Sequence, residues 1–129
     1  MLRDSEVILF CQTANGERAR IFYGDTLGLT FQGEDPFALV FSTGGVLLRV
    51  QKMRTEYSPL DWTRFGWQVS DIVASVKELT TRGVTFERRP GVVQDELGIW
   101  TVPGDGTKVA WFKDPDGNLL SLTQFPARP

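Results

Sequence analysis

Residues 111–124 read WFKDPDGNLLSLTQ, and this stretch predicts the architecture around it. At its centre, Pro115 presets one turn dihedral and Gly117 accepts a positive φ, so residues 114–118 are expected to form a tight turn. Apolar and polar residues alternate after the turn, as they do in a strand with one buried face. The stretch is therefore predicted to be a β-hairpin, with Ser121 on its second strand.

Length and composition limit the function classes. The chain has 129 residues, 41% of them hydrophobic, and a formal net charge of −2, which is ordinary for one globular domain. We therefore expect a single domain over residues 1–129. No dense block of Lys and Arg is present, so neither nucleic acid nor an anionic membrane is an expected partner. The first ten residues contain one apolar run of four residues, at residues 7–10, which is too short for a signal peptide or a membrane span. We therefore expect a cytoplasmic protein.

The chain contains one cysteine and no histidine. Cys11 lies in an apolar, strand-like run and cannot form a disulfide within the chain, so it is predicted to fill the core. Without histidine, the commonest general base near neutral pH and the commonest ligand for zinc, nickel or iron are both missing. Any metal ion would have to be held by oxygen atoms.

The order of predicted elements occurs twice along the chain. Residues 6–13 read as a strand, and a helix follows in which Asn15 is the N-cap and Gly28 the stop. Three β-rich runs come next, at residues 29–33, 37–42 and 46–51. After a polar linker, the second copy comprises a strand at residues 64–70, a helix from Asp71 to Gly83, and further strands at residues 84–89, 98–104, 109–114 and 118–124.

This repeat predicts an α+β fold of two βαβββ modules. Module one is expected at about residues 5–51, the linker at 52–61, and module two at about 62–125. Aligning the two closing hairpins places Ser121 at the position equivalent to Arg49. Helices on one side of each mixed sheet leave its other side open, and two such sheets would enclose a cup.

Two stretches carry a resemblance to a known family. Residues 15–29, NGERARIFYGDTLGL, and residues 111–124 resemble the two signature stretches of the vicinal oxygen chelate superfamily, which includes glyoxalase I, bleomycin-resistance proteins and extradiol dioxygenases. The second stretch is the more specific, and the resemblance covers nearly the whole chain. It implies two βαβββ modules forming an open, cup-shaped mixed sheet with the helices outside, often completed in a homodimer.

The family's metal ligands are not matched. In metal-dependent members, four symmetric strand positions supply His, Glu or Gln, and these positions fall on Ile8, Arg49, Arg64 and Ser121. A divalent ion needs several lone-pair donors, which one alkyl group, one hydroxyl and two permanent cations cannot provide. We therefore expect neither a metal nor another cofactor.

Strand alternation predicts which residues face the cup. The expected ligand-binding set is Ile8, Phe10, Gln12, Arg49, Arg64, Gln68, Ser121 and Thr123. The two arginines could clamp a carboxylate or phosphate. Base rates instead favour, for at least one of them, an ion pair with an acid of the protein or a position at the rim of the cup. By the same alternation, Trp67 is expected to point toward the helix layer.

Three functions remain open from the sequence. The first is a metal-free protein that binds a small organic molecule, with anions among the candidates, as the bleomycin-resistance type sequesters its drug. The second is a glyoxalase-like lyase or isomerase with a non-standard site, and the third is a dimerisation module with a vestigial cup. No catalytic residue is assigned: Asp95 and Glu96 read as loop acids, and the turn accounts for Asp114 and Asp116.

Overall fold

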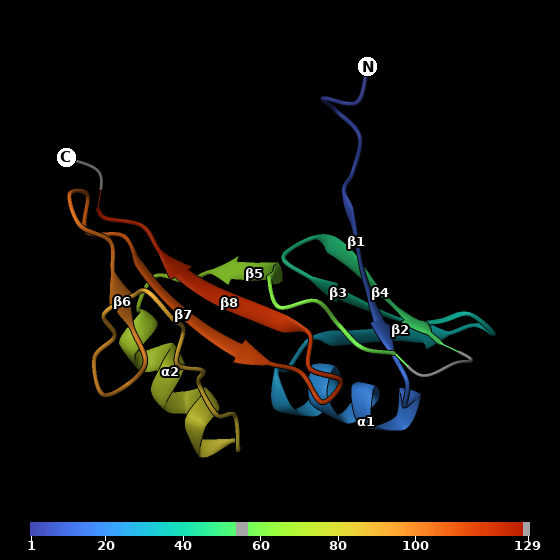
Figure 1. Ribbon diagram of the computed structural model, residues 1–129. Coiled ribbons are helices and arrows are strands. Elements are labelled where there is room, and N and C mark those ends of the chain that lie inside the picture. The colour runs from blue at the N-terminus through green and yellow to red at the C-terminus, as the bar shows by residue number, and fades with distance from the viewer. Residues whose placement is uncertain (54–56, 128–129) are drawn as a thin grey trace. The chain divides into compact units, whose positions relative to one another are not determined.

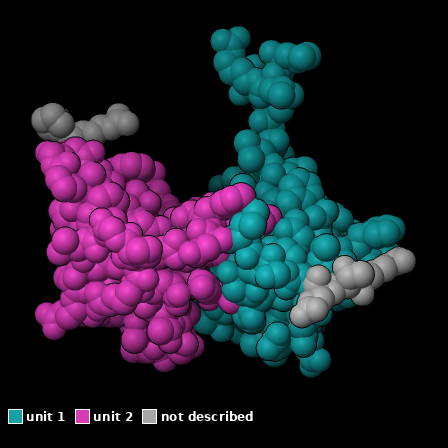
Figure 2. Space-filling model, in the orientation of Figure 1, with its two compact units in different colours: residues 1–60, 115–118 teal, residues 61–114, 119–129 magenta. Residues whose placement is uncertain are grey.

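The computed structural model describes residues 1–53 and 57–127. The chain forms two compact units (Figure 2): unit 1 comprises residues 1–60 and 115–118, and unit 2 comprises residues 61–114 and 119–129. The turn predicted at residues 114–118 is thus divided, because its last four residues group with unit 1. No helix in the described part of the chain is long and apolar enough to cross a membrane.

Unit 1 contains one βαβββ module (Figure 1). Its four-stranded sheet has the order β1-β4-β3-β2, in which β1 runs parallel to β4 and the other pairs are antiparallel. The elements are β1 (Ile8–Thr13), α1 (Gly16–Arg20), the π-helical segment η1 (Ile21–Thr26), β2 (Thr30–Glu34), β3 (Ala38–Thr43) and β4 (Val46–Lys52).

The first helix begins and ends where the sequence predicts. Asn15 is the N-cap, and its side-chain oxygen accepts a 3.1 Å hydrogen bond from the backbone N–H of Arg18. Gly28, at φ 77°, ends the helical stretch in a conformation that favours glycine. The second half differs from the expected α-helix, because it widens into η1 and the Leu27 N–H donates to the Phe22 carbonyl.

The core of unit 1 lies between the sheet and its helical segments. Cys11 is fully buried, as predicted, and its thiol lies 3.6 Å from the Tyr23 hydroxyl. The Tyr23 ring packs against Phe41 at a centroid distance of 5.8 Å. Burial of this apolar surface is the main stabilising contribution to such a core. Its other buried side chains include Ala19, Leu39, Leu48 and Val50.

Unit 2 contains the second βαβββ module, so the predicted α+β repeat is confirmed. Its sheet has the order β5-β8-β7-β6, with β5 parallel to β8. Asp71 is the N-cap of the helix and accepts from the Ala74 N–H. The elements are β5 (Thr63–Gln68), α2 (Ile72–Thr81), β6 (Trp100–Thr101), β7 (Lys108–Lys113) and β8 (Leu119–Gln124).

The strand expected at residues 84–89 does not form, which corrects the sequence analysis. Only Phe86 makes a bridge, to Phe112. The Gln94 side chain takes up backbone groups that a neighbouring strand would otherwise pair: its oxygen accepts from the Arg89 N–H, and its amide donates to the Glu87 carbonyl. The segment therefore satisfies its hydrogen-bonding groups as a loop.

Aromatic side chains fill the helix side of the second sheet. Trp67 stacks on Phe112 at a centroid distance of 6.3 Å and meets the edge of Phe65 at 5.4 Å. Phe112 is fully buried and also contacts Phe86. The predicted inward orientation of Trp67 is therefore confirmed, and this indole belongs to the core.

Candidate functional site

In each sheet we call the face that no helix of the same unit covers the open face. On the open face of the unit 1 sheet, Ile8 lies opposite Leu47 and Phe10 lies opposite Arg49. Ile8 is 47% exposed, Phe10 46% and Leu47 40%, although all three are large and apolar. Alternation explains the placement, because Cys11, which follows Phe10, and Leu48, which follows Leu47, are fully buried in the core. The three residues form an exposed apolar strip across β1 and β4.

Polar side chains border this apolar strip. Next to Phe10 along β1, the Gln12 side-chain amide donates a 2.9 Å hydrogen bond to Gln51, its register partner on β4. The amide pair holds both side chains in one orientation, and amides can donate to or accept from a ligand. Ile8, Phe10 and Gln12 are half-buried or exposed, whereas Cys11 and Thr13 of the same strand are buried, and contact of the first three with a ligand stays a prediction.

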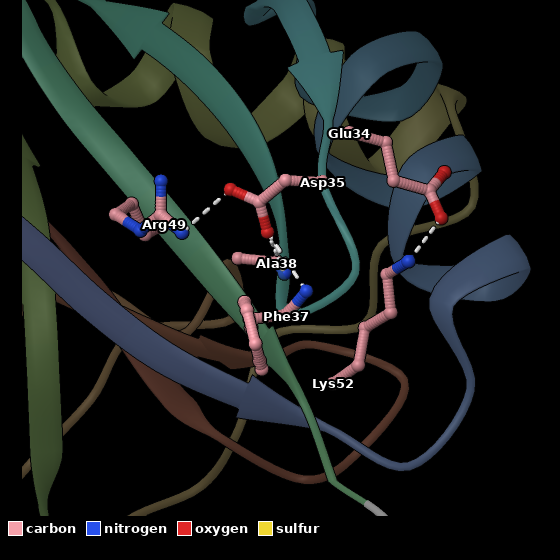
Figure 3. A network of polar contacts seen from close by, with 6 residues as sticks. All are labelled: Glu34, Asp35, Phe37, Ala38, Arg49 and Lys52. Atoms are coloured by element: carbon pink, nitrogen blue, oxygen red, sulfur yellow. Dashed lines mark hydrogen bonds and ion pairs between the residues drawn. The ribbon is translucent and has the colours of Figure 1, made fainter.

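Arg49 has a partner within its own unit (Figure 3). Its guanidinium donates a 2.8 Å hydrogen bond to Asp35, whose other oxygen accepts from the N–H groups of Phe37 and Ala38. The hydrogen bond from Arg49, followed by those from the backbone, lowers the pKa of Asp35 below its ordinary value. The expectation that at least one arginine pairs with an acid or lies at the rim is confirmed by this ion pair. A ligand anion at Arg49 would compete with Asp35.

A second ion pair lies beside the first. The Lys52 ammonium contacts the Glu34 carboxylate, from the ends of β4 and β2 (Figure 3). Two acids and two bases thus form ion pairs at this end of the sheet.

The open face of the unit 2 sheet carries small and aromatic residues in rows. One row across β5, β8 and β7 comprises Gly66, Ser121 and Trp111, and the next includes Gln68 and Thr123. Trp111 stacks on Trp100 of β6 at a centroid distance of 6.1 Å and an interplanar angle of 22°. The sheet therefore presents an indole pair beside hydroxyl and amide groups, a combination that suits aromatic ligands.

Gly66 and Ser121 approach each other closely. A Cβ atom added to Gly66 would lie 2.2 Å from Ser121 Oγ and 2.4 Å from the Ser121 carbonyl oxygen. No side chain fits there, so packing requires glycine at this position. Backbone conformation does not require it, because Gly66 does not have a positive φ. Strand alternation alone does not indicate this constraint, because the close approach depends on the parallel pairing of β5 and β8.

Arg64 lies at an irregularity in β5. Thr63 pairs with Leu119 and Phe65 with Leu120, so Arg64 is the extra residue of a bulge and has no position in the ladder. It is half-buried. Simple alternation does not extend through a bulge, and the orientation of Arg64 toward a ligand stays a prediction.

The residues at the family's four ligand positions do not fit a divalent metal ion. Ile8 offers an exposed alkyl group, Arg49 is ion-paired, Arg64 is a cation, and Ser121 offers one hydroxyl. Within residues 1–53 and 57–127, no group of three or more His, Cys, Asp or Glu side chains is placed to hold a metal. This donor set supports no chemistry that runs through a chelated ion.

Two of the acids considered from the sequence, Asp95 and Asp116, have structural partners. The Asp95 carboxylate accepts from the N–H groups of Leu97 and Ile99, each at 2.9 Å. Asp116 bonds to Thr13 and Ala14, far from it in sequence. Their carboxylates therefore order the backbone. Sequence reasoning attributed Asp116 to its turn alone and missed these bonds, since no local pattern indicates them.

Comparisons with known proteins agree with this architecture. The sequence model described as Glyoxalase/Bleomycin resistance protein/Dioxygenase superfamily matches residues 9–122. A search of curated proteins found no match.

Solved structures with the same fold are numerous. A superfamily member from Sphaerobacter thermophilus DSM 20745 is 25% identical with a TM-score of 0.72, over 96% of this chain and 99% of that one. TnmS3, an antibiotic binding protein from Streptomyces sp. CB03234, is 22% identical with a TM-score of 0.72, over 98% and 99%. Lactoylglutathione lyase from Agrobacterium tumefaciens is 17% identical with a TM-score of 0.68, over 94% and 93%.

Proposed function

Because the chain belongs to the Glyoxalase/Bleomycin resistance protein/Dioxygenase superfamily, we propose that it binds a small organic molecule on the open faces of its sheets, without a divalent metal ion. Each open face is considered by itself. The proposed contact residues are Ile8, Phe10, Gln12 and Arg49 on the sheet of unit 1, and Arg64, Gln68, Ser121 and Thr123 on the sheet of unit 2.

One observation carries this proposal: the exposed apolar strip of Ile8, Phe10 and Leu47. Leaving such groups in water is unfavourable, and contiguous exposed apolar surface bordered by polar groups marks binding sites. The Gln12–Gln51 amide pair and the Arg49–Asp35 ion pair provide that polar border. A mainly apolar surface with few fixed polar groups is the usual composition of a small-molecule site.

A binding role also fits what the comparisons offer. The family includes bleomycin-resistance proteins, and TnmS3, which has the same fold, is described as an antibiotic binding protein. The lyase or isomerase reading lacks comparable support. Its family chemistry uses metal ligands that the four positions do not provide, and Asp95 and Asp116 are engaged with backbone N–H groups.

The experiment is a thermal-shift screen against aromatic natural products, antibiotics and organic acids, followed by calorimetry of any hit. Replacing Phe10 by Ser should weaken a true ligand tenfold or more, since a buried phenyl group contributes about 1.5–3 kcal/mol. Phe37→Ser is the matched control, because Phe37 is 67% exposed but lies in the loop between β2 and β3. Equal binding by both variants and the unmodified protein, or no hit in the screen, would overturn the proposal.

A further inference from the structure

Unit 1 has a hollow on a side of the module that the proposed site does not use. It lies between the helical stretch α1–η1 and the start of β2, and its volume is about 440 Å³. Pockets of about 300–1,000 Å³ hold small organic ligands. Its lining includes Glu17, Arg20, Ile21, Asp25, Leu29 and Phe31.

One helical stripe forms the wall of the hollow. Glu17, Ile21 and Asp25 follow at steps of four residues, which places their side chains along one side of a helix. The last two belong to η1. Helical segments with π geometry are rare and frequently coincide with functional sites. The hollow and the unusual helix are separate observations that point to the same place.

The base of the hollow is apolar. It includes Leu29 and Phe31, and Ile21 is 52% exposed at its edge. The Arg20 guanidinium lies over the Phe31 ring, 4.3 Å from its centroid. This cation–π contact fixes the guanidinium against the base.

The charges of the hollow do not neutralise one another. Two carboxylates, Glu17 and Asp25, and one guanidinium, Arg20, give a formal charge of −1. In the part of the chain that the structure describes, no ion pair is found for any of the three. A negatively charged rim above apolar surface is complementary to a positively charged group attached to an apolar body.

We propose that this hollow binds an organic amine, with its ammonium group at the negatively charged rim of Glu17 and Asp25 and its apolar part on Ile21, Leu29 and Phe31. A charge-assisted hydrogen bond to one carboxylate orients the ammonium, and the second carboxylate, two helical turns away, adds attraction through space. The same carboxylates repel organic acids. This site is independent of the open faces and does not rest on the function proposed for them.

The test is a titration of ¹⁵N-labelled full-length protein, followed by amide NMR, with three probes of nearly equal shape. These are phenethylammonium, 2-phenylethanol and phenylacetate. Phenethylammonium should shift the amide signals of Gly24, Asp25 and Leu29 and saturate at about 1–10 mM, whereas the neutral and anionic probes should bind at least about fivefold more weakly. Equal shifts from all three probes, or shifts confined to β1 and β4, would overturn the proposal.

Charge variants provide the second arm. The double substitution Glu17→Gln and Asp25→Asn keeps the shape of both side chains and should weaken phenethylammonium about fivefold or more. Glu6→Gln is the matched control, because Glu6 is an exposed acid of the same unit outside the hollow. A dispersed amide spectrum of each variant establishes that it is folded. Unchanged affinity in the double variant, or an equal loss in Glu6→Gln, would refute the assignment.

Discussion

The Thr13 hydroxyl donates a 2.6 Å hydrogen bond to the carboxylate of Asp116, a residue 103 positions later in the chain. The other oxygen of Asp116 accepts from the Ala14 N–H at 2.8 Å. Two residues further on, Asn118 donates to the Gln12 carbonyl and accepts from the Tyr57 hydroxyl. The turn between β7 and β8 therefore holds the end of β1 as well as reversing the chain.

Asp116→Ala should lower the free energy of unfolding by about 2–3 kcal/mol, because hydrogen bonds to a charged group contribute about 1.5–3 kcal/mol each and this carboxylate is partly exposed. Urea denaturation measures the change. Asp105→Ala is the control, because the Asp105 carboxylate accepts a 2.8 Å hydrogen bond from the Thr107 N–H within its own turn, and its loss should cost less. Equal losses in the two variants would mean that the long-range bonds contribute nothing.

Gly66→Ala should destabilise the protein by about 1–3 kcal/mol or more, since the added methyl group would overlap the Ser121 backbone. Gly16→Ala is the matched control. Its Cβ would lie 3.7 Å from Leu39 and 4.0 Å from Lys52, ordinary contacts at the first position of α1. Thermal or urea unfolding compares the two. If Gly66→Ala were as stable as Gly16→Ala, the close approach of β5 and β8 would be wrong.

The Asp35–Arg49 pair predicts a pH-dependent contribution to stability. Because Arg49 lowers the pKa of Asp35 in the folded state, this contribution is fully present above the unfolded-state pKa and is lost as the pH falls through the folded-state value. Asp35→Asn should therefore destabilise the protein at pH 7 by an amount that disappears below the ordinary value of 3.8. Urea titrations between about pH 3 and 7 test this. Asp4→Asn, on an exposed terminal segment, should change stability at neither extreme.

Purified protein should retain no stoichiometric divalent transition metal, because Ile8, Arg49, Arg64 and Ser121 provide too few lone-pair donors. Elemental analysis after dialysis measures the content. One tightly held zinc, nickel, manganese or iron ion per chain would contradict both this expectation and the proposed metal-independent function.

We also propose that the protein is a homodimer, as the family resemblance implies, with exposed apolar side chains or unpaired strand edges available for association. Light scattering at micromolar concentration should then give about twice the chain mass of 14.5 kDa. A single species at the chain mass itself would contradict the dimer.

Local signals in the sequence predicted most of the fold. Asn15 and Asp71 are caps that act through their immediate neighbours, and Gly28 and Gly83 supply the positive φ that ends each helical stretch. The strand expected at residues 84–89 does not form, and the cause lies outside that segment. The Gln94 side chain forms hydrogen bonds with backbone groups of the segment, and alternation within the segment contains no information about these bonds.

Only part of the candidate site could be predicted from the sequence. Alternation placed Ile8, Phe10 and Gln12 on one face of β1 because this strand is regular. It cannot assign a face to Arg64, because β5 has a bulge at that residue. The partner of Arg49 could be anticipated as an acid but not named, since Asp35 reaches it through the pairing of three strands. Side-chain partners of this kind depend on tertiary packing.

The burial of Asn118 bears on the order of events during synthesis. Its amide group is fully enclosed and satisfies the Gln12 carbonyl and the Tyr57 hydroxyl. When the ribosome has released only the first sixty residues, both groups still lack this partner, because residue 118 has not yet been made. Domains usually fold in the order in which they are synthesised. Here the Gln12 carbonyl and the Tyr57 hydroxyl, both in the N-terminal half, gain this partner only after residue 118 has been made, so the first module completes its hydrogen bonds later than its place in the chain suggests.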